Sequence, residues 1–399
     1  MKNSYDAIVV GARCAGSPTA MLLARKGYRV LLVDRATFPS DTVSSHIIQP
    51  PGVGALARWG LLDRLVETGC PPMRKYEYDF GAVRISGSPG RRDIPASYCP
   101  RRTVLDKLLV DAASEAGVEV RENFTVTEIV VKAGYVVGIK GHTRNGQTVE
   151  DRATIVIGAD GFHSVVAKAV QPEQYNYHPP QNVAYYSYWS GLPVDNRCEI
   201  HIRPGRGWGV APTHDGLTMI IGGWPYAEFA KNKDDVEGNF MKMFGLVPEF
   251  EERVRGARRE AKFAGIPLPN YFYKPYGPGW ALVGDAGYIK DSITAQGIAD
   301  AFLDAERLTA ALDKALDGTH SYDEAMSEYQ RARDQHAMPM FEMTVQMAKL
   351  EPPPPQMQHL LGAIQGNQSA MDGFAQMNTG TITPAEFMAT VGVESGPAT

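Results

Sequence analysis

The sequence predicts an α/β fold in which a Rossmann-like domain carries an inserted β-sheet domain and a helical C-terminal segment. Three observations lead to this prediction. Three short apolar stretches, far apart in the chain, each run into a turn that contains glycine and aspartate. The segment between the second and third stretches is rich in aromatic and β-branched residues, as strands are. Beyond residue 300 the apolar residues recur at helical spacing.

Residues 4–34 have the pattern of a strand, a tight turn, a helix and a second strand. Ala7–Val10 is an apolar run, Gly11–Gly16 forms the turn, and the second strand ends on Asp34. N–H groups at a helix N-terminus stabilise a pyrophosphate, and a carboxylate at this position can accept both hydroxyls of an adenosine ribose. This unit is therefore predicted to bind a dinucleotide.

Arg13 occupies the position of the second glycine in the G-x-G-x-x-G pattern. That glycine normally lets the backbone approach the phosphates, so the arginine indicates either an altered turn or a side chain directed outward. A glycine turn of this kind can also be purely structural. The second and third apolar stretches help to distinguish between these alternatives.

The second and third stretches repeat the pattern of the first. Ala153–Gly158 is a predicted strand that runs into Asp160, and Trp280–Val283 runs into Gly284-Asp285, after which Gln296-Gly297 open a long helix. The carboxyl ends of parallel strands meet at one edge of a sheet, so the three turns are expected to converge on one elongated ligand.

The same patterns divide the chain into six segments. The C-terminal segment is expected to be ordered, because Thr383–Glu386 is a capping box with proline at the first helical position. The predicted segments are 1–72, 101–170 and 276–345 for the nucleotide-binding domain, 73–100 for a β excursion toward the insert, 171–275 for the β-rich insert, and 346–399 for the C-terminal helices.

Polar aromatic residues mark a candidate active site. His46 follows the second strand in a polar loop, where it is either an active-site residue or a histidine that packs the loop. Tyr186, Tyr188 and Trp208 lie on predicted strands of the insert. Aromatic residues there indicate either a substrate-binding surface or an aromatic core between domains.

Composition limits the function. A net charge of −5 in 399 residues gives no electrostatic case for binding nucleic acid. No apolar stretch is long enough for an integral membrane helix, and the N-terminus has no signal-peptide pattern, so a cytoplasmic protein is expected. The four cysteines are scattered, which indicates buried reduced thiols and no metal site.

With these motifs together, the sequence resembles the flavin-dependent monooxygenases of the aromatic hydroxylase (group A) type and their relatives, the geranylgeranyl reductases and flavin halogenases. The likeness covers approximately residues 4–345. The matching motifs are Gly11-x-Arg13-x-x-Gly16 with Asp34, Gly158-Ala159-Asp160-Gly161 with Ser164, and Gly284-Asp285-Ala286 with Gln296-Gly297.

The resemblance implies that FAD is the dinucleotide. The first motif would hold its pyrophosphate, Arg102 would approach it, Asp285 would bind the ribityl chain, and the turn before the last helix would present N–H groups to the flavin pyrimidine edge. A positive helix N-terminus there stabilises the charge of a reduced flavin. The cofactor residues implied are Gly11, Arg13, Cys14, Ala15, Gly16, Asp34, Arg35, Arg102, Asp160, Gly284, Asp285, Ala295, Gln296 and Gly297.

The activity implied is that of a monooxygenase. NADH or NADPH would reduce the flavin, O2 would form a C4a-hydroperoxide, and one oxygen atom would pass to a small aromatic or polyketide-like substrate. The family often has arginine where this chain has Ala167, and proline where it has Ser292, which leaves the contact with nicotinamide and the positioning of substrate open. The catalytic and substrate-binding residues implied are His46, Tyr186 and Tyr188, with Trp208 and Pro212 as further substrate contacts.

Three other functions are weighed against this one. A halogenase is disfavoured because Gly209 stands where the halogenase pattern has its second tryptophan, which leaves room for an organic substrate. A reductase of an isoprenoid-type double bond would deliver hydride from the same flavin and would need an elongated apolar tunnel. A flavin-binding protein without turnover is the third. The substrate, the choice between NADH and NADPH, and the oligomeric state stay open.

Overall fold

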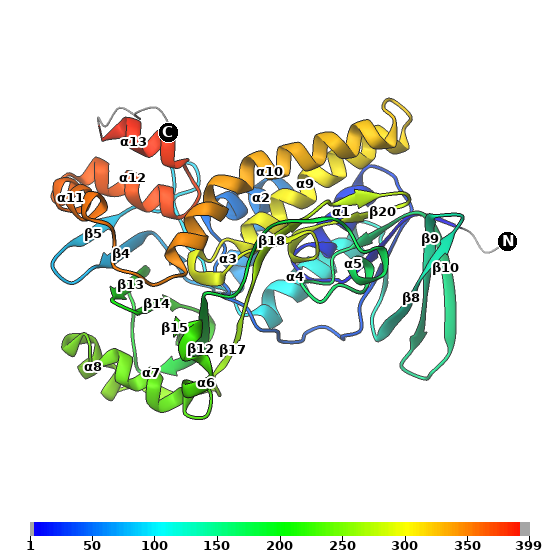
Figure 1. The fold of residues 1–399 in the computed structure, drawn as a ribbon. Helices are drawn as coiled ribbons and strands as arrows, with labels where there is room; N and C mark the ends of the chain where they lie inside the picture. Colours follow the sequence, from blue (N-terminus) through cyan, green and yellow to red (C-terminus); the bar gives the residue numbers. More distant parts are fainter. Residues whose placement is uncertain (1–3, 392–399) are drawn as a thin grey trace.

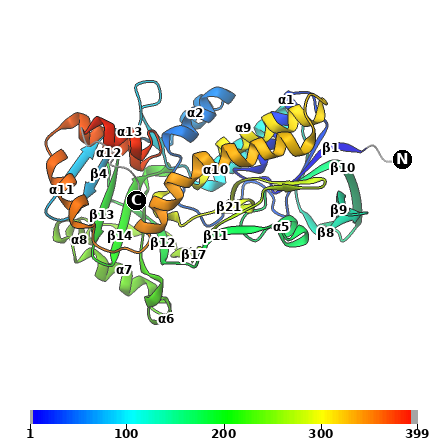
Figure 2. The same cartoon turned by 45° about the horizontal axis from the view of Figure 1, so that its top comes forward.

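The computed structural model describes residues 4–391, so the predictions for residues 1–3 and 392–399 lie outside the described residues. Figure 1 shows the α/β domain with two long helices, the insert in green below it, and the C-terminal helices in orange and red beside the insert. The view in Figure 2 shows the same arrangement from above.

The central sheet is built from the strands that end in the glycine turns. Its strand order is β19-β20-β10-β1-β2-β7, and all neighbouring pairs from β20 to β7 are parallel. Val10 lies opposite both Val33 and Gly158, and Gly158 lies opposite Leu282, so the carboxyl ends are level. The bounds are β1 Tyr5–Val10, β2 Val30–Val33, β7 Glu119–Arg121, β10 Thr148–Gly158, β19 Tyr276–Gly277 and β20 Trp280–Leu282.

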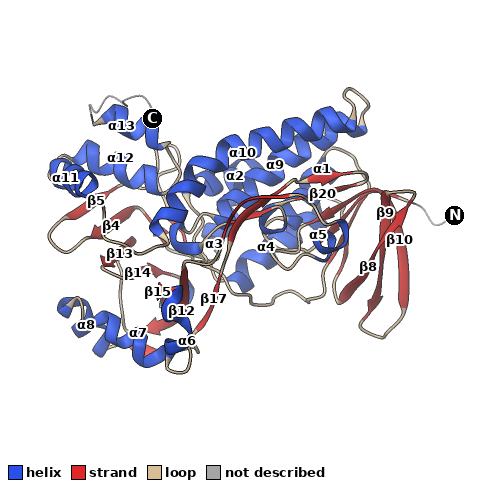
Figure 3. Ribbon diagram, in the orientation of Figure 1, coloured by secondary structure: helices blue, strands red, loops and turns tan. Residues whose placement is uncertain are grey.

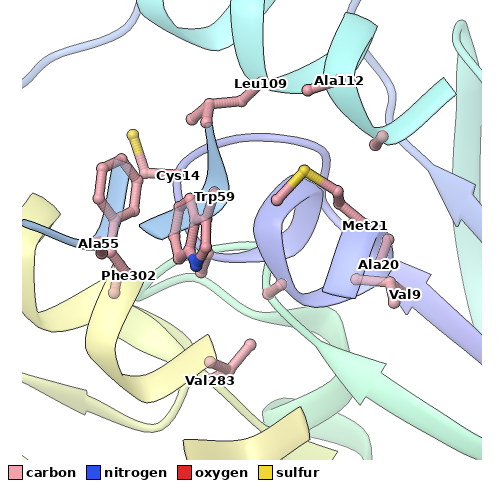
Figure 4. Packing of buried hydrophobic residues seen from close by; sticks show 14 of the residues in the cluster. Val9, Cys14, Ala20, Met21, Ala55, Trp59, Leu109, Ala112, Val283 and Phe302 are labelled. Carbon is pink, nitrogen blue, oxygen red and sulfur yellow. The ribbon is translucent and has the colours of Figure 1, made fainter. Parts of the chain in front are cut away.

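Helices cover this sheet, and their apolar side chains form a hydrophobic core with it. Figure 4 shows side chains from four of them meeting over the sheet, and the ring centroids of Trp59 and Phe302 lie 5.1 Å apart. Each large apolar side chain buried in such a core contributes roughly 1.5–3 kcal/mol. The helices are α1 Gly16–Arg25, α2 Pro50–Trp59, α3 Leu62–Glu67, α4 Arg102–Glu115, α5 Val165–Val170, α9 Gly297–Leu316 and α10 Tyr322–Met347.

A hairpin extends one end of the domain, on the right in Figure 1. Strand β8 (Phe124–Lys132) pairs with β9 (Tyr135–Thr143), which in turn pairs with β10. The turn between them has positive φ at both Ala133 and Gly134, the geometry that tight hairpins use.

The insert forms a second sheet in the order β16-β12-β15-β14-β13-β4-β5, with β17 on β12. Strand β4 pairs in parallel with β13, so the excursion at 73–100 joins the sheet of the insert. Figure 3 shows helices on both sides of this sheet. The strands are β4 Lys75–Asp79, β5 Arg84–Gly87, β12 Asn182–Ser190, β13 Arg197–Arg203, β14 Arg206–Pro212, β15 Thr218–Pro225, β16 Arg258–Arg259 and β17 Ala264–Pro267.

The insert also contains three short helices, α6 (Phe229–Asn232), α7 (Val236–Phe244) and α8 (Pro248–Arg255). The side chain of Asp235 caps α7, and Pro248 opens α8, so local signals for these helices were present. Their phenylalanines pack against one face of the sheet, which would otherwise expose apolar side chains to water.

The other face of this sheet packs against the C-terminal helices α11 (Pro355–Ile364), α12 (Gln368–Asn378) and α13 (Pro384–Thr390). The capping box expected at Thr383 and Glu386 is present. Two small sheets complete the fold, β3 (Pro72–Met73) with β6 (Ser97–Tyr98), and β11 (Gln174–His178) with β18 (Asn270–Tyr273) and β21 (Tyr288–Ile289). Among residues 4–391, no helix is both long and apolar enough to cross a membrane.

Candidate active site

The three glycine turns contact one another at the carboxyl edge of the central sheet. Gly11 has a φ of +103°, and a Cβ added to it would lie 2.5 Å from the carbonyl oxygen of Ala159. A Cβ on Gly284 would lie 2.8 Å from the Cβ of Ala15. No larger residue fits these close approaches. The expected convergence of the three turns is therefore confirmed.

Asp34 closes the first turn. Its two carboxylate oxygens accept hydrogen bonds from the backbone N–H groups of Ala12 and Ala36, both at 2.7 Å. Each oxygen keeps a second lone pair, so the carboxylate can still accept ribose hydroxyls. Arg35 is exposed beside it.

Arg13 and Arg102 share one buried carboxylate, that of Asp106. The Nε of Arg102 donates to Asp106 Oδ1 at 3.0 Å, and Arg13 also donates from Nη2 to the hydroxyl of Ser40 at 3.0 Å. Two guanidinium groups on one carboxylate leave a net positive charge beside the glycine turn. That charge suits a phosphate group.

Asp106 was not predicted from the sequence, although its i,i+4 spacing from Arg102 on α4 is a signal for an ion pair. The Sγ of Cys14 lies 3.5 Å from its Oδ1. Burial raises the pKa of this thiol to about 12, so Cys14 is protonated at neutral pH and contributes to packing.

The third turn carries a carboxylate, that of Asp285. The side chain of Asp285 is in contact with water. The protein that surrounds it still removes part of its hydration, which raises the pKa of this carboxyl to about 6, and the negative charge of Asp300 adds to the effect. Its Oδ1 lies 4.0 Å from the position that a Cβ on Gly297 would occupy. A carboxylate that water reaches but protein encloses is suited to bind hydroxyls of a ligand.

Gly297 is the first residue of the twenty-residue helix α9, and it is exposed. Ala295 before it has a φ of 50°, which turns the chain into the helix. Within residues 4–391, the N–H groups of Gln296 and Gly297 have no acceptor, whereas the side chain of Gln296 donates to Asn378 at 3.0 Å. The backbone of this turn is thus available to an anionic or carbonyl group.

Asp160 lies between the first and second turns. Its Oδ2 accepts from the N–H of Val165 at 2.7 Å, while Oδ1 is buried without a partner among the described residues. Burial raises the pKa of this carboxyl. The side chain of Ser164 caps the short helix α5 by accepting a hydrogen bond from the N–H of Ala167.

These groups fit FAD. A net positive pair of arginines and the N-terminus of α1 match a pyrophosphate, and Asp34 and Asp285 match the hydroxyls of ribose and ribityl groups. The N–H groups of Gln296 and Gly297 at the start of α9 match the electron-rich edge of a flavin.

The structure brings His46, Tyr186 and Tyr188 together. His46 is fully buried, and its Nδ1 lies 2.7 Å from the carbonyl oxygen of Ser44, so Nδ1 carries the hydrogen. Its Nε2 therefore accepts the hydrogen bond from the hydroxyl of Tyr188 at 2.8 Å. Burial, and then the charge of Arg102, lowers the pKa of His46 to about 4, so the ring is neutral at pH 7.

Tyr186 completes this cluster. Its ring centroid lies 4.9 Å from that of His46, and its hydroxyl donates to the carbonyl oxygen of Thr42 at 3.4 Å. Burial raises the pKa of Tyr186 to about 12. The positive charge of Arg102 acts on the pKa of Asp285 in the third glycine turn and on those of His46 and Tyr186 in the aromatic cluster.

Trp208 and Pro212, predicted as further substrate contacts, lie on the face of the sheet opposite the cluster, and their contact with substrate stays a prediction. Trp208 is 2 % exposed and packs against Phe244 and Phe250 on the opposite face of the sheet. Side chains alternate along a strand, so Pro212, four residues further along β14, faces the same way. The register places Gly209, and not Trp208, on the face of Tyr186.

The fold, these groups and the family match together define the class of protein: the chain is an FAD-dependent oxidoreductase with a Rossmann-like domain. It belongs to the FAD binding domain family, which matches residues 4–344.

Known proteins resemble the chain in sequence and in structure. The digeranylgeranylglycerophospholipid reductase of Methanosarcina mazei is 30 % identical over 331 residues, which cover 77 % of this chain and 74 % of the reductase. The flavin-dependent brominase Bmp2 has a similar structure, with a TM-score of 0.83 at 18 % identity and 98 % of both chains covered. PqsL of Pseudomonas aeruginosa, described as a probable FAD-dependent monooxygenase, has a TM-score of 0.72 at 19 % identity, covering 94 % of this chain and 99 % of PqsL. The two structures support the fold alone.

Proposed function

We propose that this enzyme is an NADH- or NADPH-driven monooxygenase, which places one oxygen atom of O2 on a small aromatic or polyketide-like substrate. The observation that carries the proposal is the joining of His46, Tyr186 and Tyr188 into one buried polar aromatic cluster. The charge of Arg102 acts both on this cluster and on Asp285, one of the groups that fit FAD. An aromatic ring packs well against such a surface.

Bound FAD, once reduced, supplies the electrons with which one oxygen atom of O2 reaches the substrate while the other leaves as water. The chain's own residues bind, orient and exclude water. Asp285 and the N–H groups of Gln296 and Gly297 would hold the cofactor. Tyr188 holds its hydroxyl proton toward Nε2 of neutral His46, so this pair can keep a proton beside the substrate.

The reductant and the compartment are part of the proposal. The nicotinamide cofactor would approach the same edge of the central sheet, because the described residues contain one set of parallel strands ending in glycine turns. Ala167 is buried in α5 and offers no charge to it. We place the reaction in the cytoplasm, where both nicotinamide cofactors are available.

A reductase is the second candidate, because the Methanosarcina mazei relative reduces a digeranylgeranylglycerophospholipid by its name. Saturating such a chain needs a long apolar tunnel, whereas the cluster on β12 is polar and aromatic. Bromination is disfavoured because Gly209, not a tryptophan, occupies the face of the cluster.

Isotope labelling separates these reactions. The purified holoenzyme is supplied with NADPH or NADH, ¹⁸O2, bromide and a panel of aromatic compounds, and products are identified by mass spectrometry. The proposal predicts substrate-dependent O2 consumption and one ¹⁸O atom per product. A reductase would add two hydrogen atoms without consuming O2, a halogenase would need the halide, and a flavin-binding protein without turnover would leave the nicotinamide cofactor unoxidised.

A further inference from the structure

The turn that precedes helix α9 is held by two distant parts of the chain. The side chain of Gln296 donates to the carbonyl oxygen of Asn378 at the end of α12. At the start of the turn, the carboxyl group of Asp291 accepts a hydrogen bond from the side chain of Asn182, the first residue of β12 in the insert. The N–H groups that match the flavin edge therefore belong to a segment with a fixed position.

Asp291 is a buried carboxyl, and the groups that bond it are neutral. Its Oδ1 accepts from the side chain of Asn182 at 2.7 Å and from the backbone N–H of Ile293 at 2.9 Å. Its own backbone N–H donates to Oδ1 of Asn270 at 2.7 Å. Asp291 and Asn182 are each 4 % exposed, and Asn270 is fully buried. Two neutral donors on one oxygen compensate only part of the cost of burying a charge.

Burial raises the pKa of Asp291 to about 7, and its two hydrogen bonds limit the rise. The pKa carries no contribution from a charged group among residues 4–391. The titratable groups on the elements around Asp291 are Lys290 and Asp300, which pair with each other, His178 on β11, Tyr271 on β18, Tyr186 on β12 and the exposed Glu342 on α10. A carboxyl of this kind responds to a small change in nearby charge.

Asp291 lies close to the place where a reduced flavin would carry its charge. Its side chain caps the short helix Ser292–Thr294, Ala295 bends the chain with a φ of 50°, and Gln296 and Gly297 follow. At about 2 Å per residue in such a helix, Asp291 lies roughly 10 Å from the N–H groups of these two residues. One negative charge at that distance within a protein raises the proton affinity of a carboxyl about tenfold.

We propose that Asp291 is a redox-linked proton site: its carboxylate binds a proton when FAD held at the carboxyl edge of the central sheet is reduced, and releases it on reoxidation. A hydride from NADH or NADPH brings two electrons and one proton to the flavin, which then carries one negative charge. The further proton that Asp291 binds comes from solvent and offsets this charge. Local fluctuations that admit water suffice to bring a proton to a buried carboxyl. The site serves flavin reduction, whether oxygenation or another reaction follows.

The test compares the holoenzyme with Asp291→Asn, which keeps an oxygen for the same two hydrogen bonds but binds no proton. Midpoint potentials are measured without O2 from pH 6 to pH 10, with dithionite and redox dyes. A tenfold change in proton affinity corresponds to about 30 mV for a two-electron couple. The potential of the unmodified protein is therefore expected to fall about 30 mV more over this range than that of Asp291→Asn. Other titrating groups, Asp285 among them, are present in both proteins and cancel.

Two further variants make the comparison specific. Asn182→Ala removes one donor to the carboxylate, so the pH window of the additional fall should move up by about one pH unit. Asp317→Asn is the matched control, because Asp317 accepts from the backbone N–H of Thr319 at 2.9 Å in the same i,i+2 arrangement but is exposed. It should leave the potential unchanged at every pH.

Infrared difference spectra of the reduced and oxidised holoenzyme give a second readout. Reduction of the unmodified protein near pH 7.5 should produce the C=O band of a newly protonated carboxyl group, which shifts in D2O. The band should be absent in Asp291→Asn and present in Asp317→Asn. If Asp291→Asn does not retain FAD, the shifted window of Asn182→Ala and the band in the unmodified protein still decide the matter.

Equal pH dependence of the potential in the unmodified protein and Asp291→Asn would overturn the proposal, as would reduction without a carboxyl band. A constant difference in potential at every pH would also contradict it, since Asp291 would then act on the structure of the turn and not as a proton acceptor. A band that persists in Asp291→Asn would assign the proton to another carboxyl. These measurements use neither O2 nor an organic substrate, so failure of the monooxygenase reaction is detected separately, by the ¹⁸O measurement.

Discussion

The hydroxyl oxygen of Tyr188 lies 2.8 Å from Nε2 of His46. Tyr188 belongs to strand β12 of the insert, and His46 belongs to the loop that follows β2 of the central sheet. This hydrogen bond therefore joins the two parts of the protein, and it fixes which nitrogen of the histidine carries the hydrogen.

Removing that hydroxyl tests its role. Tyr188→Phe leaves Nε2 of His46 as a buried acceptor without a partner, at a cost of about 1–3 kcal/mol. We expect substrate-dependent oxygenation to fall about tenfold while FAD content is unchanged. Tyr185→Phe is the matched control, because Tyr185 is on the same strand but packs on the other face against Trp224. Equal losses in both variants would contradict the role given to Tyr188.

The low pKa of His46 makes stability depend on pH. An unfolded histidine takes up a proton below about pH 6.5, whereas folded His46 does so at about pH 4, so stability falls as pH drops through this window. The free energy of unfolding of the unmodified protein, minus that of His46→Gln, should decrease by about 3 kcal/mol from pH 7 to pH 4. Denaturant titrations at several pH values measure it, and parallel curves for the two proteins would refute it.

Alanine substitutions at Gly11 and Gly27 distinguish the cost of backbone strain from the cost of close packing. Both have positive φ, but a Cβ on Gly27 meets nothing within 4 Å, whereas one on Gly11 meets the second turn. Gly27→Ala should cost about 1–2 kcal/mol for the left-handed backbone alone. Gly11→Ala should cost distinctly more and abolish FAD retention. Equal unfolding free energies for the two variants would show that the turns are not packed as described.

The shared carboxylate of Asp106 predicts an electrostatic contribution to cofactor binding. Arg102→Gln removes one of the two positive charges beside the first turn, so the Kd for FAD should increase about tenfold or more, as expected for losing a charged hydrogen bond. The exposed pair of Arg64 with Glu115 provides a control, and Arg64→Gln should leave this Kd unchanged. Fluorescence titration of the flavin-free protein measures both.

The turns and strands were predictable because their signals are local. Gly11–Gly16, Asp34 and Gly284-Asp285 follow buried apolar runs, and parallel strands bring such turns to one edge whatever the rest of the chain does. The side on which Trp208 packs depends on strand register, which one strand does not reveal.

The rest of the site depends on contacts between distant segments. Asp106 forms an ion pair with Arg13, 93 residues away in the chain. Arg101 contacts two residues of the insert, the ring of Tyr188 and Nδ1 of His214. No spacing in the sequence announces such pairs. His46, Tyr186 and Tyr188 could be nominated individually, but their hydrogen bond and the resulting tautomer required the tertiary structure.

Equilibrium dialysis of the folded, flavin-free protein against FAD tests the central claim most directly, namely that three glycine-and-aspartate turns close around one flavin nucleotide. Circular dichroism establishes folding first, and Asp34→Ala and Asp285→Ala are measured alongside. We predict one FAD bound per chain at saturation, with weaker binding in both variants. A folded chain that takes up no FAD, or that binds it equally well without either carboxylate, would contradict this site.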